Sequence, residues 1–314
     1  MKRAFVFPGQ GSQAVGMGRE LADAFSAARL VFEEVDEALG QRLSRLMFEG
    51  PAEELTLTEN AQPAIMAVSM AALRVLQQEA GFRLPDRAAF VAGHSLGEYA
   101  ALAAAGSLTL ADAARLLKRR GQAMQKAVPV GQGAMAAVLG LDLEAVEALV
   151  RESAGSDICA CANDNGPGQV VISGDRAAVE RAIQLAKEKH GKKAMMLPVS
   201  APFHCPLMQP AADAMAEALA GIALLPPQVP VVSNVTATAT SDPVTIKARL
   251  VTQVTGLVRW RETVLFLKAQ GVGEQVELGA GRVLAGLLKR IDKDIQAQAA
   301  HTPAEIEALA RALG

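Results

Sequence analysis

The sequence of 314 residues has few aromatic residues (4%), only three cysteines and no large excess of either charge. Cys159, Cys161 and Cys205 are an odd number and lack the spacing of a zinc site, so we expect neither a disulfide scaffold nor a bound metal. The 31 basic and 33 acidic side chains leave a net charge of −2. This balance argues against nucleic acid or an anionic membrane surface as a partner.

The sequence also lacks a membrane-spanning pattern and a signal peptide. The longest stretch without charge, residues 218–241, contains Pro226, Pro227 and Pro230, which would leave backbone groups unsatisfied in lipid. The apolar run near the N-terminus ends at Pro8 after four residues, far short of a signal sequence. Because 51% of the residues are apolar, a large core is expected. We therefore predict a soluble, cytoplasmic protein with no membrane contact.

Short apolar runs alternate with segments of helical periodicity, which is typical of an α/β fold. The apolar runs predict strands at 4–7, 88–92, 229–233 and 274–278. The periodic segments predict a helix with Ser26 as its N-cap, and further helices at 64–78, 97–105 and 283–291.

The middle of the chain has a different order of elements. Strands are predicted at 134–139, 158–162, 169–173 and 194–199, and helices at 143–152 and 176–190. This β-α-β-β-α-β order is typical of a ferredoxin-like unit. We therefore expect a small domain at 128–197, inserted into a discontinuous larger domain made of residues 1–127 and 198–314.

The motif Gly-His-Ser-Leu-Gly at 93–97 follows a predicted strand and opens a predicted helix. This context is required for a nucleophile elbow, in which two glycines permit a tight turn that presents the serine hydroxyl. The helix N-terminus supplies N–H groups for a developing oxyanion. Ser95 is therefore the candidate nucleophile.

A serine nucleophile needs a base, and the sequence contains four histidines. His94 adjoins the serine and is expected to point away across the turn. His190 lies in a lysine-rich, solvated segment, and His301 lies near the C-terminal end. His204 follows a predicted strand in an uncharged loop that contains prolines, so it is the best candidate. No aspartate can be singled out as a third member.

A second motif favours a different class of protein. Gly9 and Gly11 follow the first strand as in a loose dinucleotide-binding fingerprint, with Glu33 and Glu34 about twenty residues further on. However, these acids lie within a helical pattern, and Pro8 is unfavourable before a phosphate-binding turn. A nucleotide-binding oxidoreductase remains a weaker alternative.

Three separated segments together resemble the malonyl-CoA:acyl carrier protein transacylases. They are Phe-Pro-Gly-Gln-Gly-Ser-Gln at 7–13, Gly-His-Ser-Leu-Gly-Glu-Tyr at 93–99 and the Phe203-His204 loop. Further matches are Gln62-Pro63-Ala64, Arg119-Arg120-Gly121, residues 163–169, Gln253, Trp260 and residues 277–281. The resemblance spans nearly the whole chain.

The resemblance implies an α/β-hydrolase-like large domain with an inserted ferredoxin-like small domain. It assigns Ser95 as nucleophile, His204 as base, the Gln10 and Leu96 N–H groups as oxyanion hole, Arg120 as ligand of the malonyl carboxylate, and Gln253 as a lining residue whose segment orients the histidine. The family does without the usual aspartate. No cofactor is implied, since coenzyme A enters as the substrate thioester.

The implied reaction transfers a malonyl group from malonyl-CoA to the phosphopantetheine thiol of an acyl carrier protein through malonyl-Ser95. Fatty acid synthesis is the expected pathway, because no ketosynthase or carrier sequence is attached. Polyketide synthesis and a serine esterase or thioesterase remain alternatives. Basic residues that we expect to contact an acidic carrier are Lys187, Lys189, Lys192, Lys193, Lys289 and Arg290.

Overall fold

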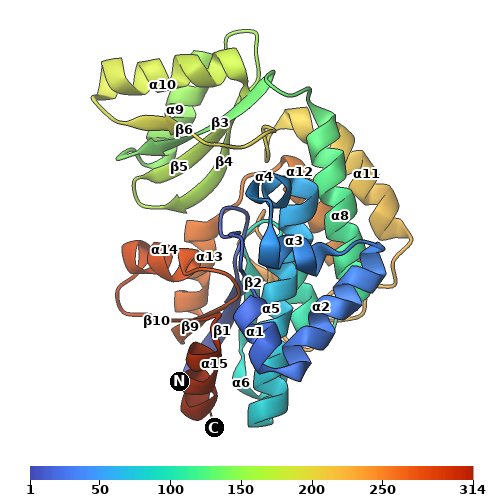
Figure 1. Ribbon diagram of the computed structural model, residues 1–314. Helices are drawn as coiled ribbons and strands as arrows, with labels where there is room; N and C mark the ends of the chain where they lie inside the picture. The colour runs from blue at the N-terminus through green and yellow to red at the C-terminus, as the bar shows by residue number, and fades with distance from the viewer. Residues whose placement is uncertain (314) are drawn as a thin grey trace.

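Two β-sheets organise the chain in the computed structural model, which describes residues 1–313 (Figure 1). The larger sheet has the strand order β10-β9-β1-β2-β7-β8. Its strands are β1 (Lys2–Phe7), β2 (Phe90–Gly93), β7 (Val231–Val232), β8 (Ala239–Thr240), β9 (Val272–Leu278) and β10 (Gln296–Ala300). Neighbouring strands are parallel, except that β8 pairs antiparallel with β7.

Helices cover both faces of the larger sheet, which explains why Ala4–Phe7 of β1 and the central strand β2 are continuous apolar runs. In β1, Phe5 and Phe7 face one core while Ala4 and Val6 face the other. The helices around this sheet are α1 (Arg19–Ala24), α2 (Ser26–Leu39), α3 (Leu43–Glu49), α4 (Ala52–Thr56), α5 (Thr58–Ala80), α6 (Leu84–Arg87), α7 (Gly97–Ala104), α8 (Leu110–Ala127), η1 (Pro206–Met208), α11 (Gln209–Ala220), α12 (Pro243–Thr255), α13 (Trp260–Ala269), α14 (Val283–Ile291) and α15 (Pro303–Leu313).

The smaller sheet is antiparallel and has the strand order β4-β5-β3-β6. Its strands are β3 (Gly133–Leu139), β4 (Cys159–Gly166), β5 (Gln169–Asp175) and β6 (Ala194–Met196), and helices α9 (Leu143–Ala154) and α10 (Arg176–His190) pack on one face. Along β3, Val138 faces these helices, whereas Met135 belongs to the core of the larger unit. The chain thus has a mixed α/β fold with two sheets, as predicted.

Several predicted elements differ from the structure in detail. Ser26 is the first helical residue of α2 and not its N-cap; the cap position is Phe25, which has extended backbone and no capping side chain. The strand predicted at 194–199 ends at Met196, close to Pro198, which lacks the N–H needed to extend a ladder. The strand predicted at 229–233 is reduced to Val231–Val232.

Within residues 1–313, no helix is both long enough and apolar enough to cross a membrane.

Candidate active site

Ser95 lies at the tight turn between β2 and α7, with a left-handed backbone (φ 53°). The glycines on either side are required by close approach of the backbone. A Cβ on Gly93 would lie 1.9 Å from the carbonyl carbon of Gly97, and one on Gly97 would lie 2.2 Å from the oxygen of Phe7. Any side chain at either position would push the turn apart, so the motif forms a nucleophile elbow.

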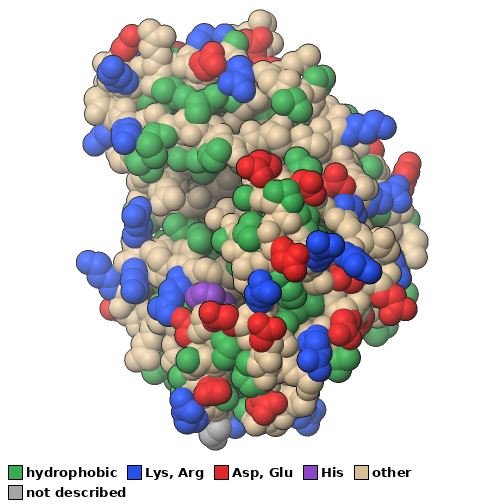
Figure 2. Space-filling view, viewed as in Figure 1, with side chains coloured by type: hydrophobic (Ala, Val, Ile, Leu, Met, Phe, Trp, Pro, Cys, Tyr) green, Lys and Arg blue, Asp and Glu red, His purple; other side chains and the backbone are tan. Residues whose placement is uncertain are grey.

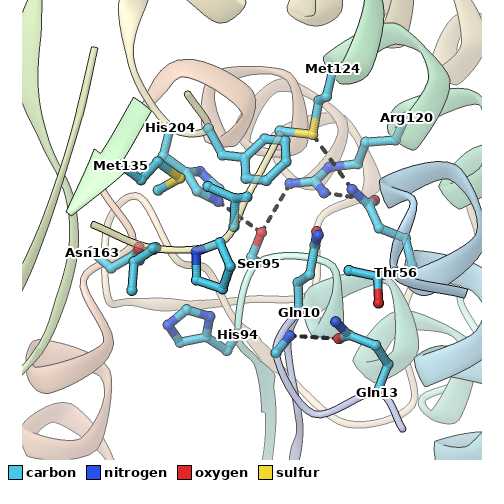
Figure 3. Close-up of a pocket in the computed structure, with 16 residues that line it drawn as sticks. Gln10, Gln13, Thr56, His94, Ser95, Arg120, Met124, Met135, Asn163 and His204 are labelled. Atoms are coloured by element: carbon cyan, nitrogen blue, oxygen red, sulfur yellow. Dashed lines mark hydrogen bonds between the residues drawn. The ribbon is translucent and has the colours of Figure 1, made fainter. Parts of the chain in front are cut away.

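His204 lies next to the serine hydroxyl, with its Nε2 2.8 Å from Ser95 Oγ (Figure 3). Its Nδ1 lies 2.8 Å from the backbone oxygen of Gln253, so Nδ1–H donates to a carbonyl and Nε2 accepts from the serine. The histidine is 3% exposed. Burial, followed by the charge of Arg120, lowers the pKa of His204 to about 3. The imidazole is therefore neutral and able to accept a proton.

Arg120 is a buried cation (1% exposed) on α8 whose hydrogen-bond acceptors are all uncharged. Its Nη1 donates to Gln62 Oε1 at 2.8 Å, and its Nη2 donates to Gln253 Oε1 at 2.8 Å and to Ser95 Oγ at 3.1 Å. Its Nε–H has no partner within residues 1–313. The adjacent Arg119 instead forms an exposed ion pair with Glu217.

Gln10 and Leu96, whose N–H groups are the expected oxyanion hole, both lie close to Ser95 in the chain or in the cavity. Leu96 precedes the first turn of α7, and Gln10 lines the same cavity as Ser95. In the described part of the chain, neither N–H donates a hydrogen bond. Gly9 packs so closely on His94 that an added Cβ would lie 2.7 Å from the His94 oxygen. This contact holds the Gln10 loop against the elbow.

A cavity of about 500 Å³ lies between the two sheets and contains these groups. Figure 2 shows the hollow, with apolar side chains around it. Met135 and Asn163 come from the smaller sheet, whereas Ser95, His204 and Arg120 come from the larger unit. An apolar wall is formed by Met124, Met135, Leu197, Pro198, Val199 and Phe203. The cavity can hold a long, partly apolar ligand chain whose end reaches Ser95.

Of the other histidines, His94 also lines this cavity, whereas His190 and His301 do not. His94 Nε2 is 2.9 Å from Asn165 Oδ1, and its ring packs against Trp260. His190 is exposed at the end of α10, and His301 lies beside Glu305.

The geometry does not favour a dinucleotide site. The loop after β1 does not open a helix, since α1 begins only at Arg19. Glu33 and Glu34 are exposed on α2 and do not follow a second strand. The loop with Gly9 instead lies on the elbow of Ser95.

Two buried residues of the site were not identified from the sequence. Asn234 accepts the Ser95 N–H through Oδ1 at 2.7 Å and donates from Nδ2 to the Gly93 oxygen at 2.7 Å. Glu98 accepts from Gln253 Nε2 at 2.8 Å. The one available signal for Asn234 was its position directly after the predicted strand 229–233, at the carboxyl edge of the sheet where sites form.

Known proteins resemble the chain over almost its full length. The family model described as "Acyl transferase domain" matches residues 4–302. The malonyl CoA-acyl carrier protein transacylase of Bacillus subtilis (strain 168) is 47% identical over 307 residues, which are 98% of this chain and 95% of the relative. The crystal structure of acyl-carrier-protein S-malonyltransferase from Bartonella henselae is 56% identical, with a TM-score of 0.97 and complete coverage of both chains.

A third match is a complex. A malonyl-transacylase bound to its type II PKS acyl-carrier protein is 44% identical, with a TM-score of 0.95 over 99% of this chain and all of the other. The family model, the similar structures and the grouping of Ser95, His204 and Arg120 therefore all indicate the same family. The chain belongs to the acyl transferase domain family and, within it, to the malonyl CoA-acyl carrier protein transacylases.

Proposed function

We propose that the protein transfers the malonyl group of malonyl-CoA to the phosphopantetheine thiol of an acyl carrier protein. The observation that carries this proposal is the buried Arg120, whose Nη2 lies 3.1 Å from the oxygen of the nucleophile, Ser95. An acyl group bound to this oxygen would have a guanidinium within reach of its far end. A carboxylate is the group that such a cation binds best.

In the first half-reaction, Ser95 Oγ attacks the thioester carbonyl and His204 Nε2 accepts the hydroxyl proton. The negative oxygen of the tetrahedral intermediate accepts hydrogen bonds from the N–H groups of Gln10 and Leu96. When the C–S bond breaks, coenzyme A leaves and takes the proton from His204. The product is malonyl-Ser95.

The second half-reaction reverses these steps with a new thiol. His204 removes the proton of the phosphopantetheine thiol, whose sulfur attacks the malonyl-serine carbonyl. The Ser95 oxygen then leaves and regains a proton from His204. No cofactor takes part, and coenzyme A serves as the thiol of the donor substrate.

The malonyl carboxylate pairs with Arg120. The free Nε–H of Arg120 is a donor that this carboxylate would satisfy, while Gln62 and Gln253 hold the guanidinium in place. Burying a carboxylate without a partner is costly, and a bidentate guanidinium offsets this cost.

Fatty acid synthesis is the proposed pathway, with polyketide synthesis as the second candidate. The second candidate has support from the similar malonyl-transacylase that was solved with a type II PKS acyl-carrier protein. Comparing kcat/KM for the two kinds of carrier would separate them. An esterase or thioesterase is less favoured, because a buried cation beside the serine suits a carboxylated acyl group.

We also propose a finer description of the fold and its location. The larger sheet with its elbow is α/β-hydrolase-like, in residues 1–127 and 198–314, of which residue 314 lies outside the described residues. Residues 128–197 form a ferredoxin-like domain, supported by the β-α-β-β-α-β succession and the strand order β4-β5-β3-β6. The three free cysteines fit a reducing cytoplasm.

The test is to expose the protein briefly to malonyl-CoA and locate the adduct by mass spectrometry. We expect a malonyl group on Ser95, and none in Ser95→Ala, whose transfer rate falls by about 10⁴-fold or more. His190→Ala serves as control and keeps full transfer. Transfer by pure Ser95→Ala would contradict the assignment, and release of free malonate in place of malonyl-carrier would indicate a hydrolase.

A further inference from the structure

Glu98 is a buried acid that the reaction described above does not use. It lies on α7, one turn after Ser95, and is 2% exposed. A carboxylate is rarely buried so deeply unless hydrogen bonds or a counter-charge compensate. The hydrogen-bond partners of Glu98 therefore indicate its role.

The first contact of Glu98 connects it to both functional groups beside Ser95. Glu98 Oε2 accepts from Gln253 Nε2 at 2.8 Å. Because Nε2 is held there, Gln253 Oε1 faces Arg120 and accepts from Nη2 at 2.8 Å. The backbone oxygen of the same glutamine accepts from His204 Nδ1 at 2.8 Å.

The second contact reaches the elbow. Glu98 Oε2 also accepts the backbone N–H of Asn234 at 3.1 Å. The Asn234 side chain in turn binds the Ser95 N–H and the Gly93 oxygen, both at 2.7 Å. A single carboxylate oxygen is thus connected to the arginine, the histidine partner and the serine turn.

The charge of Glu98 acts on Arg120 as well. The other groups around the acid are uncharged: Gln253 from α12, and Ser233 and Asn234 after β7. Tyr99 on the same helix also stays neutral, because burial raises its pKa to about 12. Arg120 on α8 is the cation whose charge lowers the pKa of Glu98.

We propose, building on the proposed malonyl transfer, that Glu98 is a positioning residue with two roles. It fixes the Gln253 amide so that the glutamine oxygen holds Arg120, and it provides the counter-charge of Arg120 until the malonyl carboxylate replaces it. When the substrate carboxylate pairs with Arg120, Glu98 takes up one proton from solvent, so that one cation does not face two buried anions.

Geometry and electrostatics permit this exchange. Both N–H donors bind Oε2, so protonation at Oε1 leaves them in place. Burial raises the pKa of Glu98 to about 7, against the opposing hydrogen bonds and the charge of Arg120. The acid is therefore ionised above pH 7 and protonated below it. Malonyl binding should weaken as pH rises through 7, whereas acetyl binding should not.

Two variants separate the roles. Glu98→Gln keeps an oxygen for both donors and removes the charge, whereas Glu98→Ala removes both. The control is Glu277→Gln, which changes another buried acid whose pKa burial raises to about 7, but which accepts only N–H groups at the start of α14. Single-turnover acylation of Ser95 by malonyl-CoA and by acetyl-CoA is measured from pH 6 to pH 9, together with the melting temperature.

We expect Glu98→Ala to lower malonylation by about 10- to 100-fold and acetylation by much less, because Arg120 loses its orientation. Malonylation by the wild type should decline above pH 7, whereas Glu98→Gln should give a flat profile with a higher rate than the wild type at pH 9. Glu277→Gln should retain the wild-type profile and the wild-type selectivity between the two acyl groups.

Either of two results would overturn the proposal. One is an equal loss for both thioesters in Glu98→Ala, which would indicate a structural role only. The other is an unchanged decline above pH 7 in Glu98→Gln, which would assign the titration to another group. If Glu98→Ala fails to fold, the pH dependence of malonylation in Glu98→Gln still tests the proposal. Failure of the proposed function is separate, since the wild type would then not form malonyl-Ser95 at all.

Discussion

At the scale of single residues, the selectivity of the site depends on a buried cation that has no anion among its hydrogen-bond acceptors. Each acceptor of Arg120 is an amide or a hydroxyl oxygen. Burial lowers the pKa of the guanidinium, which means that its charged form is destabilised by lost hydration. A substrate carboxylate would restore the missing interaction. An acetyl group would leave it missing.

We expect Arg120→Ala to reduce kcat/KM for malonyl-CoA by about 10²- to 10³-fold, because polar sites strongly reject ligands that leave a buried partner unsatisfied. The value of kcat/KM for acetyl-CoA should fall much less, since the acetyl group does not pair with the cation. The measurement is kcat/KM for both thioesters. Arg119→Ala is the control, because Arg119 is exposed and paired with Glu217. A selectivity loss in Arg119→Ala alone would assign the carboxylate to the neighbouring residue.

His204 should remain an active base well below the pH at which histidine usually titrates. Its pKa of about 3 means that it stays neutral through pH 5, whereas a histidine of ordinary pKa would lose about tenfold per pH unit below 6.5. Acylation by acetyl-CoA, which does not involve the Glu98 charge, should therefore be constant from pH 8 to pH 5. A tenfold decline between pH 6.5 and pH 5 would contradict this assignment.

The sequence was sufficient to predict the tight turn at Ser95, because its motif is local and its two glycines are required by the close approach of the backbone. The partner of His204 was expected in the segment of Gln253 only from the resemblance, because that partner is a backbone carbonyl, which every residue type carries. Arg120 could have been separated from Arg119 by periodicity, because it shares the buried face of α8 with Leu117 and Met124.

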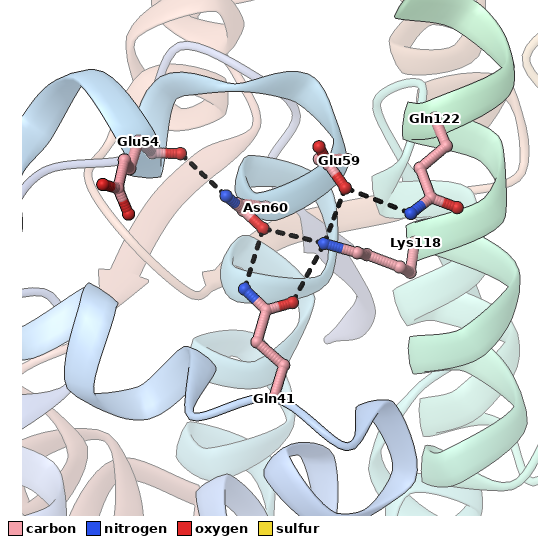
Figure 4. A network of polar contacts seen from close by, with 6 residues as sticks. All are labelled: Gln41, Glu54, Glu59, Asn60, Lys118 and Gln122. Atoms are coloured by element: carbon pink, nitrogen blue, oxygen red, sulfur yellow. Dashed lines mark hydrogen bonds and ion pairs between the residues drawn. The ribbon is translucent and has the colours of Figure 1, made fainter.

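At the scale of elements, the position of Arg120 depends on how α8 packs against the first turn of α5. Figure 4 shows the polar network between them. Lys118 Nζ lies 2.8 Å from Glu59 Oε2 and 3.0 Å from Asn60 Oδ1. Two residues further along α5 is Gln62, the acceptor for Arg120 Nη1. The network thus fixes the arginine and its acceptor as one unit.

Gly121 permits the close approach of these helices, since a Cβ there would lie 2.5 Å from Glu59 Cα and 2.6 Å from Thr58 O. We expect Gly121→Ala to force α8 away from α5, at a cost of about 1–3 kcal/mol in the free energy of unfolding. The preference for malonyl-CoA over acetyl-CoA should fall several-fold with it. Thermal denaturation and acylation rates check both effects.

The matched control is Gly286→Ala in α14, where an added Cβ meets nothing within 4 Å. That change should leave activity unchanged and stability equal or higher, because alanine favours helix over glycine by up to about 1 kcal/mol. If Gly121→Ala behaved in the same way, the helix contact would not set the position of Arg120.

Element prediction succeeded for some periodic helices, whereas others such as α8, α11, α13 and α15 were not among the predicted elements. Helices α10 and α14 have the predicted bounds. Helix α5 begins six residues before its predicted start, because Pro63 lies within it and looks like a boundary. Helix α12 was not predicted, since its valine and threonine residues are more typical of strands.

At the scale of the whole molecule, the site is formed by two units that the chain connects twice. The connection from α8 to β3 and the segment after β6 cross between them, and the second supplies Leu197, Pro198 and Val199 to the cavity. Helix α14 also contacts the smaller unit, where Arg290 Nη1 donates to Gln169 Oε1 at 3.0 Å. Figure 2 shows basic side chains on both sides of the opening.

An acidic carrier protein should dock across this opening, guided by these charges. We expect reversal of Lys289 and Arg290 to glutamate to raise the KM for carrier protein several-fold and to leave the KM for malonyl-CoA unchanged. The same reversal at Lys192 and Lys193 tests the other side of the opening. Steady-state kinetics with each substrate varied in turn provide the measurement.

The control reverses Arg83 and Arg87, which are exposed on and beside α6 at the opposite end of the molecule (Figure 1). This reversal changes the net charge by the same amount as the other two, but it should leave the KM for carrier protein unchanged. An equal rise of both KM values, or none for either pair, would exclude a basic docking surface at the opening.

The hydrogen bond from His204 to a main-chain carbonyl has a consequence for genetics. A carboxylate in that place could be deleted by one codon change, but a carbonyl is present whatever residue 253 is. Saturation mutagenesis of this enzyme should therefore reveal a two-membered catalytic set and no third member, however complete the library. Substitutions of Gln253 would then register as defects in choosing the acyl group rather than in activating the nucleophile.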